Sequence, residues 1–341
     1  MRRLVPVLVL LILLLAGCGP AAPEPEGPPP SEEPGETVSE TEEVQETAPP
    51  PEAETRPTSP LTGLPYDPAE AGSIVAVMVD NHRDARPQSG LTRADLVYEA
   101  LTEFNITRFL ALYHSRAADV IGPVRSARPY FVLLAREWNA IYAHCHGLPK
   151  DLKPIKELGV LDADELLDPR GFWRDGSRRA PHNLYTSTQG LRERMKVDTG
   201  TPKPWWEFTE FAAEPVRALS VEYDEDYVVS YRLDGDGYLR FMNGRPHVDR
   251  ETGTQIKAAN VIVQFVPHAV VYEDGGRELS LVGEGRALYL LGGRRVSGTW
   301  EKKSALAPTY FFDEEGELIQ LAPGQTWIQI VPLDAEVQFF D

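Results

Sequence analysis

The sequence predicts a mixed α/β protein in which a layered sheet-and-helix module is followed by a mostly antiparallel β module. Within residues 60–200, apolar runs of strand length alternate with segments of helical periodicity, a pattern typical of sheets covered by helices. From residue 219 to residue 341, short β-type runs follow one another and are separated by Asn-Gly and Gly-Gly turns. Residues 201–218, which carry Pro and Trp, form the predicted linker.

Residues 1–18 have the layout of a bacterial lipoprotein signal. Arg2 and Arg3 precede an apolar run that is too short to span a bilayer comfortably. The sequence LAGC at residues 15–18 resembles a lipobox, which implies cleavage before Cys18, lipid attachment to its sulfur and an extracytoplasmic location. A plain signal peptide and a membrane-spanning anchor are the alternatives. We expect stable anchoring because diacylglycerol and a further acyl chain such as palmitate would both be buried in the membrane.

Residues 19–59 are predicted to be a disordered tether. This segment is rich in Pro, Glu, Ser and Thr, and it cannot bury enough apolar surface to order itself. The whole chain carries −18, and without Arg2, Arg3 and the eleven Glu of the tether the remainder carries −9. That acidic balance argues against a general nucleic-acid surface. Cys145 is the cysteine that remains after Cys18 is lipidated, so the sequence predicts no internal disulfide.

In the first module, predicted strands end in polar residues. Residues 73–79 form a continuous apolar, β-branched run that leads into Asp80 and a polar loop. Residues 95–101 are a strand or a short helix, and residues 108–114 are a strand. Residues 140–143 form another strand, directly before His144. Polar residues at strand ends are where α/β sheets hold ligands.

The stretch Ile121–Tyr130 is predicted to be a tight turn that leads into a helix. Ser126 is the predicted N-cap, and Pro129 fits the first turn. An apolar face at helical spacing follows. Arg125 and Arg128 flank the helix start, where the macrodipole and the unpaired backbone N–H groups favour anions. Two guanidinium groups and free N–H groups would therefore converge on an anionic group bound there.

Three further segments complete the first module. Residues 149–158 are a predicted short helix, and residues 186–195 are a predicted capped helix. Between them, residues 170–181 form a long basic loop with two aromatic side chains. Loops of this length inside compact domains tend to be functional or mobile.

The second module consists mainly of predicted strands. Asp234-Gly235-Asp236-Gly237 is interpreted as a turn rather than a calcium loop, because Tyr238 occupies the third ligand position of the EF-hand pattern. The predicted strands cover residues 219–223, 227–233, 238–242, 261–266, 287–291, 296–300, 309–312 and 326–331.

Several motifs carry a family resemblance. VMVDNHRDARPQSG, IGPVRSARPYF and RRAPHNLYTS in the first module, with NGRPHVD, GTWEKKS and PGQTWIQIVP in the second, resemble the YerB-like lipoproteins, a family classed as domain of unknown function 3048. The resemblance covers residues 60–333. It implies layered sheets and helix, an extracytoplasmic lipid-anchored location, and no established activity.

An arginine-rich constellation is the main candidate site. Arginine forks donate two parallel hydrogen bonds and keep their charge, so they suit phosphate or carboxylate groups. The alternative is that these arginines form ordinary ion pairs with local acids, namely Asp80, Asp84, Asp95, Glu99, Glu103 and Asp175. The candidate ligand-binding residues are Arg86, Arg108, Arg125, Arg128, Arg174 and Arg178, with Asn81, Gln88, His144, His182 and Asn183.

Metal and catalytic hypotheses have less support. His144 and His146 with Asp80 or His82 and His182 could supply metal ligands, yet no metal-hydrolase motif is present, so no metal and no cofactor is predicted. Cys145 is interpreted as a buried small residue rather than a nucleophile. Asp80, which follows a buried strand and precedes an arginine-bearing loop, is the candidate catalytic carboxylate.

Two classes of function remain open. The favoured one is a tethered envelope protein that binds an anionic cell-envelope ligand or an envelope protein. The alternative is an extracytoplasmic phosphotransferase or hydrolase acting on envelope phosphates, with Asp80 as acid, base or orienting carboxylate. An Asp-Asn pair after a strand and arginines ahead of a helix are similar in style to the LytR-CpsA-Psr wall-polymer transferases, which favours the enzyme. A purely structural lipoprotein is the third possibility.

Overall fold

The computed structural model describes residues 56–211, 216–224, 226–271 and 275–341. The predicted signal at residues 1–18 and the tether up to residue 55 lie outside the described residues. Among the described residues, no helix is long and apolar enough to cross a bilayer.

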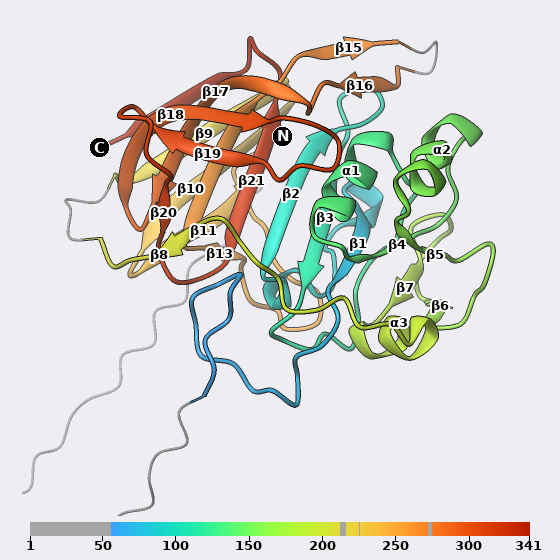
Figure 1. The fold of residues 1–341 in the computed structure, drawn as a ribbon. Coiled ribbons are helices and arrows are strands. Elements are labelled where there is room, and N and C mark those ends of the chain that lie inside the picture. The colour runs from blue at the N-terminus through green and yellow to red at the C-terminus, as the bar shows by residue number, and fades with distance from the viewer. Residues whose placement is uncertain (1–55, 212–215, 225, 272–274) are drawn as a thin grey trace, which may run out of the picture. The chain divides into compact units, whose positions relative to one another are not determined.

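A ten-stranded sheet organises the described chain (Figure 1). Its order is β19-β18-β17-β14-β21-β2-β3-β1-β4-β5, so strands from both predicted modules hydrogen-bond in one sheet. The division at residues 60–200 and 219–341 stays a prediction. β14, β21 and β2 run parallel, as do β1, β4 and β5, and the other neighbours are antiparallel. The strands are β1 (Val75–Asp80), β2 (Leu96–Leu101), β3 (Thr107–Tyr113), β4 (Ile141–His144), β5 (Leu161–Asp164), β14 (Asn260–Phe265), β17 (Gly283–Leu291), β18 (Arg294–Lys302), β19 (Tyr310–Asp313) and β21 (Thr326–Val331).

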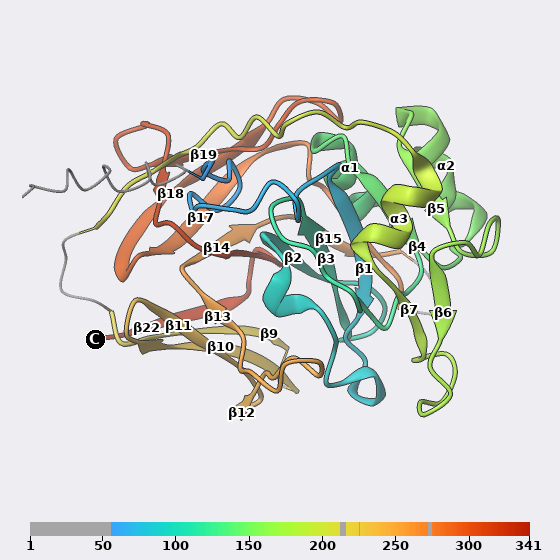
Figure 2. The same ribbon diagram turned by 90° about the horizontal axis from the view of Figure 1, so that it is seen from below.

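A second sheet packs against one face of the first, and α1 covers the other (Figure 2). β9 alternates half-buried and buried residues, as expected for a strand with one face on a core. The β10–β11 hairpin turns at Gly235 (φ +61°) and Asp236, which confirms the predicted turn. The strands are β9 (Ala218–Asp224), β10 (Tyr227–Asp234), β11 (Gly237–Met242), β12 (Arg245–Pro246), β13 (Lys257–Ala258) and β22 (Glu336–Phe340).

Among the described residues, three α-helices lie between residues 129 and 195, and two 3₁₀ turns precede them. Pro129 occupies the first turn of α1 as predicted, but Ser126 as its N-cap is wrong. The N-cap is Arg128 in extended conformation, because the Ala127 N–H donates to the His146 carbonyl and keeps the preceding chain extended (2.9 Å). The helices are α1 (Pro129–Glu137), α2 (Pro149–Leu158) and α3 (Thr188–Met195), and the 3₁₀ turns are η1 (Arg83–Ala85) and η2 (Leu91–Arg93).

The remaining strands are short and pair with one another outside the two larger sheets. The basic loop predicted at residues 170–181 is partly ordered as a strand, because β6 pairs with β7. β8, in the segment that follows α3, pairs in parallel with β20. These strands are β6 (Phe172–Arg174), β7 (Leu184–Thr186), β8 (Glu207–Phe208), β15 (His268–Val270), β16 (Arg277–Leu279) and β20 (Gln320–Leu321).

Candidate functional site

Polar residues gather where three parallel strands end. β1, β4 and β5 run parallel, and their last residues are Asp80, His144 and Asp164, all of them buried. β1 is long enough to bring Asp80 to this edge because the five residues before Asp80 are apolar and all six residues of the strand are buried. The carboxyl ends of strands in an open sheet are the usual location for a ligand site.

Asp80 is the centre of a compact polar cluster. One carboxylate oxygen lies 2.7 Å from His182 Nδ1 and 3.3 Å from Arg125 Nε, and the other accepts the backbone N–H of His82 at 2.9 Å. We call Asp80, Arg125, His182 and His82 the rim cluster. The side chains of Arg125 and His82 remain 29% and 32% exposed, whereas Asp80 is 3% exposed. The buried carboxylate therefore orients groups that reach solvent.

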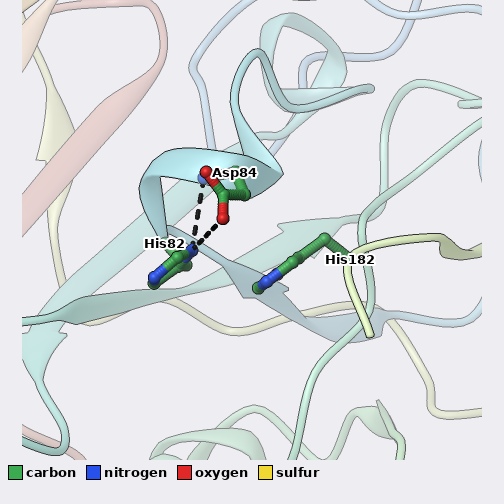
Figure 3. Close-up of side chains that lie close together, drawn as sticks. All are labelled: His82, Asp84 and His182. Carbon is green, nitrogen blue, oxygen red and sulfur yellow. Dashed lines mark hydrogen bonds and ion pairs between the residues drawn. The ribbon is translucent and has the colours of Figure 1, made fainter. Parts of the chain in front are cut away.

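His82 and His182 stack face to face beside Asp84 (Figure 3). The ring centroids are 4.8 Å apart and the planes differ by 8°. These three residues have ligand atoms within 4.8 Å of one another, a spacing at which they could hold a metal ion. Imidazole lone pairs lie in the ring plane, however, so two parallel rings do not aim at one ion. The His82 Nδ1 lone pair also accepts the Asp84 N–H at 3.2 Å. The arrangement suits stacking better than coordination.

The loop after β1 is held by side-chain amides. Arg86 donates from Nε and Nη2 to the oxygens of Asn81, and its guanidinium lies 5.3 Å from the Tyr227 ring centroid. Gln88 donates to the Asp80 carbonyl and to Asn81 Oδ1 at 3.0 and 2.9 Å. These contacts give Arg86, Asn81 and Gln88 structural partners, so the loop is fixed rather than free.

A pocket of 440 Å³ opens beside His82, between this loop and the second sheet. Arg83 and Arg86 line it from the η1 side, and Arg83 is 85% exposed. Tyr227 and Asn243 line it from β10 and the β11–β12 turn. The sequence did not point to these two residues, because they are more than 140 residues from Asn81 and no local pattern joins them.

Arg108 and Arg128 form a separate group that does not contact Asp80 directly. Both bind the carboxylate of Glu103, and Arg128 also lies 3.7 Å from Asp151. Burial raises the pKa of Glu103, but Arg108 and Arg128 outweigh it and hold that pKa below its ordinary value. Burial, with Arg128 nearby, lowers the pKa of Arg108 to about 10. For these two arginines the ion-pair interpretation fits the geometry.

Arg174 and Arg178 also have partners. Arg174 lies 3.2 Å from Glu165 and donates to Asn183 Oδ1 at 3.3 Å. Arg178 donates to the carbonyls of Ala85 and Pro87, each at 2.7 Å, and so holds the loop after β1.

His144 and Cys145 are occupied within the protein. His144 is fully buried, and its ring nitrogens lie 3.2 Å from the His146 carbonyl and 2.9 Å from Asp162. The Cys145 thiol donates to Glu165 at 3.2 Å. Burial and Glu165 raise the pKa of Cys145 to about 11, so the thiol stays protonated at neutral pH.

A second polar cluster, which the sequence did not predict, is sealed between the two sheets. Glu99 and Arg240 form an ion pair at 2.6 Å with both side chains fully buried. Arg240 also contacts His247, which lies 2.9 Å from Gln88, and Tyr227 donates to Glu99 at 2.7 Å. We call Glu99, Arg240, His247 and Tyr227 the inter-sheet cluster.

The fold and the site define a class: a protein of two packed β-sheets and few helices, with a polar site at the carboxyl ends of parallel strands. Comparison of the sequence with known families identifies the family within this class. The N-terminal domain of the protein family of unknown function DUF3048 matches residues 61–201, and its C-terminal domain matches residues 219–328. The chain belongs to this family.

Two comparisons concern proteins of Bacillus subtilis. The chain is 35% identical over 297 residues to a protein of strain 168 named Putative lipoprotein YerB, covering 81% of this chain and 87% of the relative. The crystal structure of YerB protein from Bacillus subtilis superimposes with a TM-score of 0.73 at 32% identity, covering 83% of this chain and 100% of that one. The predicted family membership and mixed fold class are therefore confirmed.

Proposed function

We propose that this protein is a lipid-anchored extracytoplasmic protein that binds an anionic cell-envelope ligand at the rim cluster. The lipobox at residues 15–18 and the similarity to a protein named Putative lipoprotein support the anchor. A tether of about 40 residues would hold the folded part roughly 35 Å from the membrane as a coil, and up to about 120 Å if extended. That reach suits a ligand within the envelope rather than one in the bilayer.

The observation that carries the proposal is the state of Arg125. Its Nε is held by the buried Asp80 carboxylate, and no described residue takes a hydrogen bond from its terminal nitrogens. The guanidinium is thus oriented but keeps donors for a phosphate or carboxylate. His82, which stacks on His182, also lines the 440 Å³ pocket together with Arg83, whereas Arg125 lies outside that lining. An anion bound at Arg125 would meet an oriented guanidinium at little entropic cost.

Calorimetric titration tests the proposal. Inorganic phosphate, pyrophosphate and an anionic wall polymer are titrated into the purified protein, with a neutral glycan as reference. We expect the anions to bind, and a ligand at 100 times its Kd to stabilise the fold by about 2.7 kcal/mol. Arg125→Gln should weaken binding about tenfold or more. Arg245→Gln, which removes one exposed charge from β12, should not change it. Equal losses in both variants would contradict a specific site.

One observation favours the enzymatic alternative. Asp80 holds His182 through Nδ1, which leaves Nε2 directed away from the carboxylate, as in a general base. A hydrolase that uses this pair would take a proton from water as the water attacks phosphorus, cleaving a phosphoanhydride into two phosphates or a phosphodiester into a phosphomonoester and an alcohol. A phosphotransferase would use an acceptor hydroxyl in place of water. His182→Gln would then abolish turnover while anion binding persists. If the parent protein binds anions and cleaves neither a phosphoanhydride nor a phosphodiester, the binding function stands alone.

A further inference from the structure

The segment after α3 returns to the main sheet and forms the β8–β20 pair (Figure 1). A second pocket lies beside this pair. It has a volume of 480 Å³, within the range of small-molecule sites. Its apolar lining includes Trp205, Leu291, Val296 and Ile319. We call it the Trp205 pocket, and none of the residues assigned to the rim cluster lines it.

The walls of the Trp205 pocket are ordered by backbone contacts. Glu207 is placed by the pairing of β8 with β20, where it lies opposite Gln320. The turn after β19 is closed by Asp313, whose Oδ1 accepts the N–H groups of Glu315 at 3.1 Å and Glu317 at 2.8 Å. The two sides of the pocket are therefore fixed before any ligand arrives, which reduces the entropic cost of binding.

Trp205 is held by three aromatic neighbours. Its ring stacks on Trp138 with centroids 4.9 Å apart and planes 25° apart, and it meets Trp206 and Tyr310 at steeper angles. Its Nε1 is buried, and it has no hydrogen-bond partner in the part of the chain that the structure describes. The pocket thus contains a rigid indole ring, the strongest of the protein aromatic groups for attracting cations.

The charges around the pocket are unbalanced. Glu207, Asp313, Glu315 and Glu317 line it together with one cation, Arg294. The carboxylates of Glu207, Glu315 and Glu317 have no ion pair or hydrogen bond with any described residue, in contrast to the paired Asp80 of the rim cluster. An excess of three negative charges beside apolar surface attracts a cation that also carries an apolar stem.

We infer that the Trp205 pocket binds an organic amine, with the ammonium among Glu207, Glu315 and Glu317 and the alkyl stem against Trp205 and Ile319. The ammonium would form charge-assisted hydrogen bonds to carboxylates that are otherwise unpartnered. The indole adds cation–π attraction, and the alkyl stem is removed from water against the apolar lining. This site is independent of the anion site proposed above.

Calorimetric titration of the full-length protein in detergent tests the inference with matched probes. Pentylamine is compared with 1-pentanol, and Nα-acetyl-lysine methylamide is compared with Nα-acetyl-norleucine methylamide. We expect both amines to bind and both neutral analogues to fail. A tighter complex with the lysine derivative would assign the ligand to a peptide chain, and a tighter complex with pentylamine would assign it to a free amine.

Two kinds of variant locate the site. The double variant Glu315→Gln with Glu317→Gln should weaken amine binding about tenfold or more, since it removes two of the unpartnered charges. Glu336→Gln, an exposed carboxylate on β22, is the control and should change nothing. Trp205→Phe should weaken binding about threefold without preventing folding, because a smaller ring replaces the indole. Equal binding of pentylamine and 1-pentanol, no binding up to about 10 mM, or full affinity in the double variant would overturn the inference.

Discussion

The inter-sheet cluster and the rim cluster use the same chemical groups in two different places, between the two sheets and at the end of β1. In each, a carboxylate on a strand binds an arginine, and a histidine contacts one of the two: His182 contacts Asp80, and His247 contacts Arg240. Glu99 and Arg240 are fully buried, whereas Arg125 keeps 29% of its side chain exposed. Solvent access is thus the main difference between them. A sealed cluster can only stabilise or specify the packing of the sheets, and an open one has donors left for a ligand.

The largest expected effect comes from breaking the sealed pair. Arg240→Met leaves Glu99 charged and buried, so we expect the free energy of unfolding to fall by about 3–5 kcal/mol. Denaturant unfolding of the purified protein measures this. The double variant Glu99→Leu with Arg240→Met should regain most of the loss, because no charge is then left unpaired. A loss under about 1 kcal/mol in the single variant would mean that water enters between the sheets.

The second largest effect on stability should come from acidification, which acts on His247 of the inter-sheet cluster. Burial and Arg240 lower the pKa of His247, so in acid the unfolded chain binds a proton that the folded protein does not. Stability should therefore fall as the pH drops below about 6.5, by up to about 1.4 kcal/mol per pH unit for this group. His268 acts in the same direction, and its contribution ends near pH 4 because burial lowers its pKa to about 4.

Unfolding at pH 7, 6 and 5 in His247→Gln and in the parent protein separates these contributions. The variant should lose less stability between pH 7 and pH 5 than the parent protein does, even if it is less stable at pH 7. The same slope in both proteins would show that His247 takes up its proton over the same pH range in the folded and unfolded chains, and the cluster would then differ from the one described.

The sequence predicted local structure well and long-range partners poorly. The run at residues 73–79 became β1 because apolar β-branched residues fill a strand that is buried on both faces. The helix predicted at residues 149–158 has the same first and last residues as α2, since Pro149 and Gly159 mark its ends. The pairing of β2 with β21 joins residues about 230 positions apart, and no local signal specifies it.

The candidate site shows the same limit. Asp80, Arg125 and His182 were among the predicted site residues, and the structure brings them together at the end of β1. Arg128 was grouped with Arg125 because they are close in sequence, yet it turns toward Glu103. Glu99 was expected to pair with a nearby arginine, but its partner is Arg240, which a separate sheet supplies. The separation of two residues in the sequence does not show toward which partner each side chain points.

Arg125 and Arg128 should therefore respond differently to substitution. Arg128 binds Glu103 and lies near Asp151, and only 17% of its side chain is exposed, so Arg128→Ala should cost about 1–3 kcal/mol of stability. Arg125→Ala should cost less than about 1 kcal/mol, because its pair with Asp80 is partly solvated, and it should instead weaken anion binding. Denaturant unfolding and calorimetric titration of both variants separate the two roles. Equal stability losses would place both arginines in one structural network.

The smallest effect on stability is expected from a change beside Cys145. The Cys145 side chain is partly exposed, and its thiol lies next to the acid Glu165. Asp80 in the rim cluster faces cations, whereas the Cys145 thiol faces Glu165, and its pKa is raised to about 11. Iodoacetamide should therefore react slowly at pH 8, and the rate should rise about tenfold per pH unit until the pH approaches 11, because the thiolate is the nucleophile. Glu165→Gln should speed the reaction at pH 8 with little change in stability. If this variant and the parent protein react equally fast, burial alone holds the proton on the thiol, and the contrast between the two carboxylates has no chemical consequence.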